Sequence, residues 1–156
     1  MAVLMYRDPA TGNAIPLGQY GVSGGAVGPQ FPMRATATLI TASLAPDAAA
    51  SGTVTLAPGY RLLRITTSRA SRVRLYTAAA KRDADVARPV GTDPAGDHGL
   101  MLEFVSAATL LSADLSPVVD GFDGKAVPDG AVPYRVANLD VSTGSVTVSF
   151  MWLRTE

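Results

Sequence analysis

The segment from Tyr60 to Gly99 constrains the fold more than any other part of the chain. Two short runs of alternating side chains, Tyr60–Thr67 and Ser71–Tyr76, follow each other closely. Alternation of apolar and polar residues with a period of two is typical of half-buried β-strands. A segment rich in acids and bases, Lys81–Pro89, and a turn-rich loop, Gly91–Gly99, come next. Two adjacent strands followed by a long polar connection indicate one face of a β-sandwich. They do not indicate an enzyme core.

Runs of the same kind recur on both sides of this segment, so we predict a mainly β chain. The cleanest run ends the chain and places Val146, Val148, Phe150 and Trp152 on one face. The strands that we predict are 36–44, 53–56, 60–67, 72–76, 100–104, 110–115, 134–139 and 145–152. About seven or eight short strands separated by turn residues favour an antiparallel β-sandwich or jelly-roll-like domain.

The same alternation assigns side chains to the two faces of each strand. The side chains that we expect on the inner face are Leu63, Ile65, Val73, Leu75, Leu100, Leu102 and Phe104. The side chains that we expect on the outer face are Leu62, Arg64, Arg72, Arg74 and Tyr76. One short helix is predicted within Thr77–Arg88, because its alanines favour a helix, Thr77 is a suitable cap and Pro89 ends the run.

The first 33 residues form a separate region in this interpretation, and residues 34–156 form the β-sandwich domain. Within 2–17, two short apolar runs flank Asp8–Gly12, whose Asp-Pro pair and glycine predict the turn of a hairpin. Within 18–33, frequent glycine and proline exclude a helix or a central strand. This stretch is either a flexible linker or an extended Gly/Pro-rich arm, and its apolar and aromatic side chains would anchor such an arm on a neighbouring surface.

Composition limits the partners of the chain. The formal net charge is zero and no basic stretch is interleaved with aromatic residues, so electrostatics give no support to nucleic-acid binding. The absence of cysteine excludes disulfides, thiolate catalysis and cysteine-zinc sites. The beginning of the chain lacks the pattern of a signal peptide, and no run approaches the ~18 apolar residues of a membrane span. Small side chains predict a thin core that a partner subunit would help to cover.

Two groups of polar residues are candidates for chemistry. His98, the only histidine, stands among acids within 93–99, where it could be a general base or a metal ligand. It has no second histidine, and no Gly-x-Ser-x-Gly motif accompanies it. We therefore expect a loop histidine that hydrogen-bonds a backbone carbonyl or a carboxylate. Asp120–Gly124 faintly resembles a calcium loop, but it lacks the ligand spacing and the closing glutamate.

The remaining charged residues are expected to serve structure. The aspartates of the two acidic loop regions would make Asx turns and ion pairs with Arg82, Arg88 and Lys125. A cluster of arginines between positions 61 and 74 could form a nucleic-acid stripe, but the balanced total charge favours cross-strand ion pairs or a subunit interface. We accordingly expect no catalytic residue, no cofactor and no metal ion.

Several stretches together resemble a β-sandwich module of structural proteins from tailed bacteriophages that infect actinobacteria. The stretches are Tyr60–Ile65, Arg72–Tyr76, Arg82–Pro94, Asp97–Leu100, Leu115–Pro117, Val136–Asn138 and a terminal strand that ends near Glu156. Together they span 53–156. The opening residues Leu4–Pro9 with Ile15–Leu17 are similar to the start of phage minor tail proteins.

This resemblance implies a non-enzymatic virion structural protein that is made in the host cytoplasm and incorporated into the particle. A minor tail protein attached through residues 1–33 is the first expectation, and a capsid decoration or head-fibre protein is the second. The alternative from a different class is a host-recognition module that binds a surface glycan through exposed Tyr76 or Phe122. An enzyme is the remaining alternative, and it would depend on His98.

The expected partners are other virion proteins and further copies of the chain. A homotrimer is expected by analogy with phage fibres and capsid decorations. No nucleic acid and no inserted membrane is expected. The residues that we expect at contacts are Tyr6, Arg7, Tyr20, Phe31, Leu62, Met101 and Met151.

Overall fold

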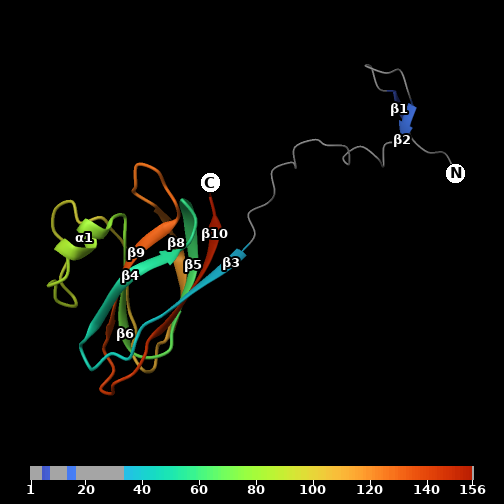
Figure 1. The fold of residues 1–156 in the computed structure, drawn as a ribbon. Helices are drawn as coiled ribbons and strands as arrows, with labels where there is room; N and C mark the ends of the chain where they lie inside the picture. The colour runs from blue at the N-terminus through green and yellow to red at the C-terminus, as the bar shows by residue number, and fades with distance from the viewer. Residues whose placement is uncertain (1–4, 8–13, 17–33, 156) are drawn as a thin grey trace. The chain divides into compact units, whose positions relative to one another are not determined.

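The computed structural model describes residues 5–7, 14–16 and 34–155 (Figure 1). The chain divides into two units, Met1–Phe31 and Pro32–Glu156. In the first unit, β1 (Met5–Arg7) and β2 (Ala14–Pro16) pair antiparallel with Tyr6 opposite Ile15, where the sequence predicts a hairpin. The predicted arm, 18–33, lies outside the described residues, as do the side chains of the expected contact residues Tyr6, Arg7, Tyr20 and Phe31.

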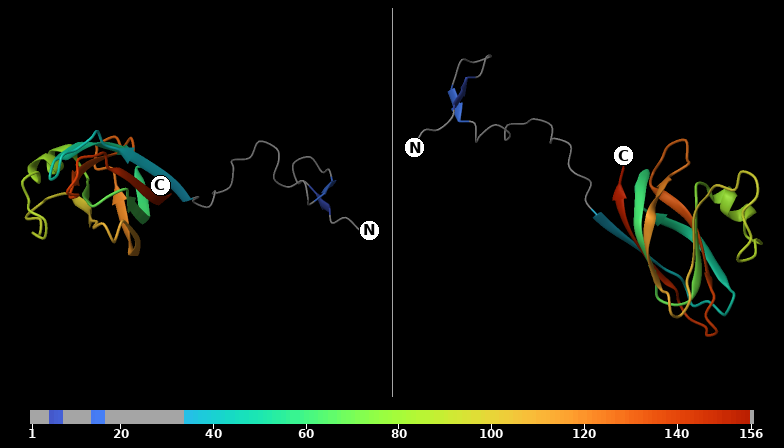
Figure 2. Two further views of the ribbon diagram at one scale, coloured as in Figure 1. Left: turned by 90° about the horizontal axis from the view of Figure 1, so that it is seen from below. Right: turned by 180° about the vertical axis from the view of Figure 1, so that it is seen from behind.

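The second unit consists of two four-stranded antiparallel sheets packed face to face (Figures 1 and 2). One sheet contains, in spatial order, β3 (Arg34–Ile40), β10 (Thr147–Arg154), β5 (Gly59–Thr67) and β8 (Ser112–Phe122). The other contains β4 (Ala49–Thr55), β9 (Ala131–Asn138), β6 (Ser71–Tyr76) and β7 (Leu100–Val105). Successive strands cross from sheet to sheet except between β6 and β7. This order is that of an eight-stranded jelly roll, which confirms the predicted fold class.

The core lies between the two sheets and is made of aliphatic and aromatic side chains. Its fully buried members include Leu62, Ile65, Val73, Leu75, Val132, Val136, Val146, Val148 and Phe150. The predicted inner face of the last strand is therefore confirmed for Val146, Val148 and Phe150. Trp152 is only half-buried, although it packs against the same core.

A β-bulge in β5 overturns one predicted face. Met151 and Trp152 are consecutive in β10, yet they pair with Arg64 and Leu62, so Leu63 is an extra residue in β5. A bulge of this kind shifts the alternation by one position. Leu62 and Ile65 consequently both face the core and are fully buried, whereas Leu63 is half-buried. The predicted outward orientation of Leu62 was wrong.

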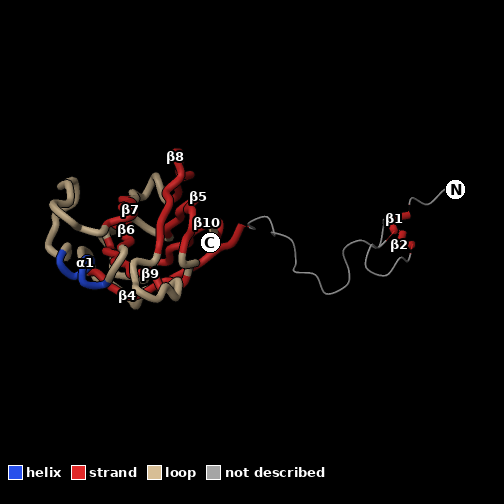
Figure 3. The backbone as a smooth tube through the Cα atoms, turned by 90° about the horizontal axis from the view of Figure 1, so that it is seen from above, coloured by secondary structure: helices blue, strands red, loops and turns tan. Residues whose placement is uncertain are grey.

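A long crossover, residues 77–99, connects β6 to β7 and contains the single helix α1 (Ala79–Ala84). Figure 3 shows α1 beside β6, and it packs against β6 and β9. The helix is shorter than the predicted range, and its N-cap is Ala78 in an extended conformation without a side-chain cap bond. Thr77 therefore lies one residue before the cap position, and its amide donates to the carbonyl of Gly99, which closes the base of the crossover.

Candidate functional site

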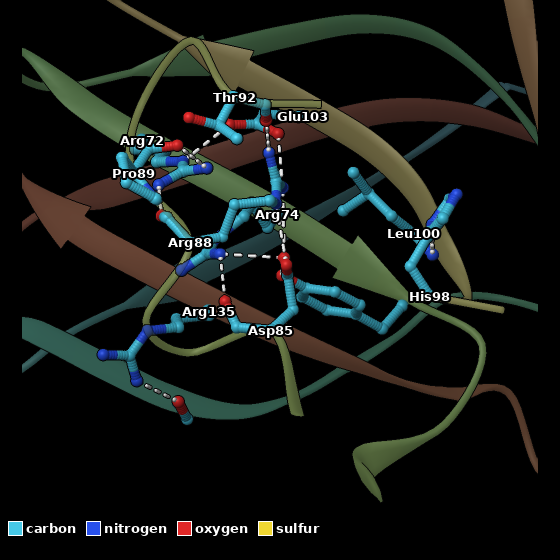
Figure 4. Close-up of polar contacts among 12 residues, drawn as sticks. Arg72, Arg74, Asp85, Arg88, Pro89, Thr92, His98, Leu100, Glu103 and Arg135 are labelled. Atoms are coloured by element: carbon cyan, nitrogen blue, oxygen red, sulfur yellow. Dashed lines mark hydrogen bonds and ion pairs between the residues drawn. The ribbon is translucent and has the colours of Figure 1, made fainter. Parts of the chain in front are cut away.

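The crossover covers the outer face of β6 and buries the polar side chains there. Val73 and Leu75 point into the core, while Arg72, Arg74 and Tyr76 lie on the opposite face of the strand. All three are nonetheless buried, with Arg72 4% and Arg74 2% exposed. The alternation thus predicted correctly that they leave the core, but the crossover keeps them from solvent. Together with Asp85, Arg88 and Glu103 they form what we call the charge cluster (Figure 4).

Asp85 follows α1 directly and is the centre of the charge cluster. Its Oδ2 accepts hydrogen bonds from Arg74 Nη1 at 2.9 Å, from the Tyr76 hydroxyl at 2.6 Å and from Arg88 Nη2 at 3.0 Å. Its Oδ1 accepts a further bond from Arg88 Nε at 2.7 Å. The carboxylate is therefore surrounded by donors from β6 and from its own loop, and it fastens the end of α1 to the sheet.

Glu103 on β7 is the second carboxylate of the cluster. Its Oε1 accepts from Arg72 Nε and its Oε2 accepts from Arg88 Nη2, both at 2.6 Å. Arg88 consequently bridges Asp85 and Glu103, and it joins the crossover to both β6 and β7. Short charge-assisted bonds between guanidinium and carboxylate groups are among the strongest polar contacts in proteins.

The arginines of the cluster also hold the backbone of the crossover. Arg72 donates to the carbonyls of Arg88 at 2.6 Å and Pro89 at 3.2 Å. Arg88 donates to the carbonyl of Thr92 at 2.6 Å, and Arg74 donates to the carbonyl of Asp85 at 2.8 Å. These carbonyls belong to a segment without regular secondary structure, so the guanidinium groups supply the partners that a sheet or helix would otherwise supply.

The electrostatics of the cluster favour fixed charges. Burial by itself would raise the pKa of Asp85, but the hydrogen bonds from Arg88 and Tyr76 and the charges of Arg88 and Arg74 outweigh it and hold that pKa well below its usual range. Burial likewise opposes ionisation of Glu103, and the bonds from Arg72 and Arg88 lower its pKa. The bond to Asp85 raises the pKa of Arg88. Burial, followed by the bond to Asp85, raises the pKa of Tyr76 to about 12.

Positive charge is in excess on this face. The cluster pairs the three arginines Arg72, Arg74 and Arg88 with two carboxylates, and Arg135 of β9 lies directly opposite Arg74 across the ladder. Burial, the main influence, lowers the pKa of Arg74, and the charge of Arg72 acts in the same direction. Among the described residues, the Nε atoms of Arg74 and Arg135 are buried without a hydrogen-bond partner. Arg135 reaches Ser51 Oγ through Nη1 at 3.2 Å.

The arrangement is suited to fastening the crossover rather than to moving protons. Carboxylates with a lowered pKa and several guanidinium partners are weak bases, and a tyrosine with a raised pKa is a weak acid at neutral pH. His98 lies at the rim of the crossover, where its Nδ1 accepts a bond from the amide of Leu100 at 2.9 Å (Figure 4). It is a loop histidine as predicted, although its partner is an amide and not a carbonyl or a carboxylate.

The loop with a faint resemblance to a calcium site is organised by Asp123. This buried carboxylate accepts the amides of Lys125, Asp129 and Gly130 at 2.9 to 3.1 Å. Asp120 points elsewhere and pairs with Arg61. In the part of the chain that the structure describes, no three acidic or histidine side chains are arranged to hold a metal ion. The aspartates of this loop thus make the turns and lysine pairs that the sequence indicates.

The arginine-rich stretch divides between two environments. Arg61 and Arg64 of β5 make exposed cross-strand ion pairs with Asp120 and Asp114 of β8, which confirms the expected ion pairing for these two residues. Arg69 donates to the carbonyl of Ser142 in the loop between β9 and β10. Arg72 and Arg74 belong to the charge cluster. The structure therefore does not assemble these arginines into one stripe.

The expected contact residues of the sandwich also lie in different surroundings. Leu62 is fully buried in the core and is not available to a partner. Met101 on β7 is half-buried, and its Sδ accepts weak bonds from the Tyr60 hydroxyl and the Phe122 amide, both at 3.5 Å. Met151 is half-buried between Thr36 and Arg64 on the outer face of its sheet. The structure does not bring these residues together.

Comparison with protein-family models, with curated proteins and with solved structures found no match to this chain. Within the described residues, no helix has the length and apolar character needed to cross a membrane.

Proposed function

We propose that the chain is a non-enzymatic virion structural protein of a bacteriophage, and specifically a minor tail protein that residues 1–33 attach to the particle. The observation that carries this proposal is that the charge cluster holds the crossover against the sheet. The most highly charged segment of the chain lies in the crossover, and its carboxylates are engaged in binding that crossover to β6 and β7. This engagement of the carboxylates supports a role as a structural scaffold.

The jelly-roll architecture supports the same proposal by analogy. Double-sheet jelly rolls occur in viral capsid proteins as well as in lectins, and fold alone does not establish function. A capsid decoration or head-fibre protein is consistent with the same observations and differs only in its position on the particle. In each case other virion proteins and further copies of the chain are the partners, and the chain is located in the virion.

Particles purified from a lysate of the encoding phage provide the test. Mass spectrometry should detect the chain in gradient-purified particles at a constant ratio to the major capsid protein, and a particle map should place it at the tail. Density at the capsid surface would select the decoration protein instead. Recovery of the chain only in the soluble fraction of the lysate would overturn the proposed virion role.

A glycan-binding host-recognition module is the second candidate, and one observation favours it. Phe122 at the end of β8 is 55% exposed, and an exposed aromatic ring is the platform on which sugars stack. Tyr76, the other ring that this function would use, is fully buried in the charge cluster. Binding in a glycan array that disappears in Phe122→Ala, with unchanged thermal unfolding, would support this candidate.

A further inference from the structure

The strand β3 forms one edge of its sheet and keeps a regular register along its whole length. It pairs with β10 over the whole of Arg34–Ile40 without a shift of register. Its sequence contains no proline and no glycine, and its only charged residue is Arg34 at the beginning. Among the described residues, no strand pairs with its other side. A long regular edge of this kind presents unpaired backbone groups that can pair with another extended chain.

Two of the other edge strands carry features that obstruct such pairing. β8 contains Pro117 and an interrupted register with β5, and β7 contains Met101 as an extra residue opposite β6. Proline and bulges are common means by which proteins block edge-to-edge association. The remaining edge strand, β4, keeps an unbroken register with β9, but Gly52 interrupts its row of side chains. β3 is thus the edge that combines an unbroken register with a sequence free of glycine and proline.

The direction of the unpaired groups on β3 follows from the bonds at its end. The amide of Thr41 donates to the carbonyl of Val146, the residue that precedes β10. Backbone groups alternate in direction along an antiparallel strand, so the groups of Leu39, Ala37 and Ala35 also point toward β10. The N–H and C=O groups of Thr36 and Thr38 consequently point away from β10, toward the free edge.

A groove runs beside this edge, between β3 and the edge strand β4 of the other sheet. Its volume is about 520 Å³, and its lining includes Leu39, Val54, Tyr134 and Trp152 with threonines of both strands. Small side chains from an added strand would therefore find room on the inner side of β3, against a lining of mixed polar and apolar groups. The groove and the open backbone edge together fit an extended segment with small inward side chains.

We propose that this edge binds β3 of a second copy of the chain, in an antiparallel pair centred on Ala37. This register uses the full length of both strands and places Ala37 opposite Ala37 of the second copy. Thr36 of each copy then lies opposite Thr38 of the other, and both have their backbone groups on the free edge. Ala35 and Leu39 would face one another above the groove, and no two like charges would be opposed.

The proposed pairing also continues a pattern that crosses the sheet. Thr38, Ser149, Thr66 and Ser112 are successive neighbours in the ladders and form one row of hydroxyl groups on the outer face. Within the row, Thr38 and Ser149 lie 3.1 Å apart and Thr66 and Ser112 lie 2.9 Å apart, measured between their oxygens. In the centred register Thr36 of the second copy extends this row, so the two sheets join as one with matched side chains.

An isologous contact of this kind closes on two copies. It therefore gives a two-fold dimer in place of the three-fold assembly that is expected from the sequence. The dimer does not depend on a virion role, because association of the free protein and the presence of the chain in particles are separate measurements. Pairing through β3 is thus tested without reference to the proposed function.

Sedimentation of the full chain tests the proposal with a matched pair of variants. Thr38→Pro removes an N–H that points to the free edge and leaves the ladder with β10 intact, whereas Thr38→Val removes the same hydroxyl and keeps that N–H. The wild-type protein and Thr38→Val should sediment at twice the chain mass of 16.1 kDa at micromolar concentration. Thr38→Pro should sediment as a monomer with native circular dichroism.

A pair of charge variants tests the register itself. The double substitution T36K/T38K places like charges opposite each other across the proposed pair and should abolish the dimer. The double substitution T36K/T38E places opposite charges in the same positions and should retain it. Both positions are outside the core, so thermal unfolding should show that each variant is folded.

A cysteine substitution gives an independent reading, because the chain contains no cysteine. Opposed residues of a pair without mutual hydrogen bonds lie close enough for a disulfide. Ala37→Cys should therefore form a covalent dimer on mild oxidation, and Thr66→Cys, in the middle of the same sheet, should not. A wild-type monomer or trimer, or a dimer that Thr38→Pro leaves unchanged, would overturn the proposal.

Discussion

The outer faces of the two sheets carry the same kinds of side chain in different surroundings. On the sheet with β5 and β8, Arg61 and Arg64 pair with aspartates across the ladder in open solvent. On the sheet with β6 and β7, the crossover covers Arg72 and Arg74, and their carboxylate partners are largely withdrawn from water. The side chains of Arg61 and Asp120 are 45% and 60% exposed, whereas those of Arg74 and Asp85 are 3% and 9% exposed.

This difference in exposure decides what an ion pair does. Exposed pairs are screened by water and salt and add little to stability. A buried pair gains no large net stability over an apolar replacement, but removal of one partner leaves the other charge uncompensated in a poorly solvated place. We therefore interpret the open face as a solvated surface and the covered face as the fastening of the crossover.

Loss of the central carboxylate should have the largest effect. Asp85→Ala leaves Arg74, Arg88 and the Tyr76 hydroxyl without their common acceptor, and breaking a buried pair in this way costs about 3 to 5 kcal/mol. Denaturant titration followed by circular dichroism measures the free energy of unfolding. The matched control is Asp114→Ala, which breaks a pair of the same residue types on the open face. Equal effects of the two substitutions would contradict the contrast between the faces.

Acid should lower the free energy of unfolding through the covered face, but by less than Asp85→Ala does. The effect is smaller because a protonated carboxyl group still accepts some of its hydrogen bonds. Asp85 and Glu103 both have a folded-state pKa below its ordinary value, despite burial, because arginines and Tyr76 bind their ionised forms. Their contribution to stability is therefore complete above the unfolded-state pKa values of about 4, and it is lost as pH falls through the lowered folded-state values.

The measurement is the free energy of unfolding between neutral pH and strongly acidic pH, for the wild type and for Asp85→Asn. The wild-type protein should lose stability steeply below about pH 4, and the substituted protein should show a shallower dependence over the same range. Parallel curves would show that the charge cluster does not govern acid stability.

The hydroxyl of Tyr76 should matter less than the carboxylate that it binds. Tyr76→Phe removes one bond to Asp85 and keeps the packing of the ring, so the expected loss is about 1 to 2 kcal/mol. Tyr60→Phe is the control, because within the described residues that buried hydroxyl makes only a long bond to the Met101 sulfur. A larger effect at Tyr60 than at Tyr76 would contradict the role of the cluster.

The sequence predicted the sandwich well because alternation directly reports the two faces of a strand. It placed Val146, Val148 and Phe150 in the core, and it separated Val73 and Leu75 from Arg72, Arg74 and Tyr76. It assigned Leu62 to the wrong face, because a bulge in β5 shifts the alternation by one residue. The pattern of apolar and polar residues alone does not reveal such a bulge. It placed Arg72 and Arg74 on the outer face but did not show that the crossover covers them, since a period of two shows which way a side chain points and not what lies over it.

One signal in the sequence could have revealed the covered face. The acids and bases of Lys81–Pro89 stand in a crossover that follows directly after a strand with two outward arginines. A charged strand face beside a charged connection suggests that the two meet. The partner of each arginine could not be chosen in this way. Glu103 comes from the next strand, and Asp85 follows a helix that is shorter than its residue propensities predicted.

The smallest effect is expected on the open face. Asp114→Asn removes a carboxylate that pairs with Arg64 across β5 and β8, but both side chains keep their contact with water. The pKa of Asp114 is lowered, chiefly by its hydrogen bond to Arg64, so what little this pair adds should vanish on acidification and in high salt. Denaturant titrations of Asp114→Asn and the wild type should give coincident midpoints in molar sodium chloride. A loss as large as that of Asp85→Ala, persisting in high salt, would show that solvent does not screen this face and that exposure does not explain the difference between the two sheets.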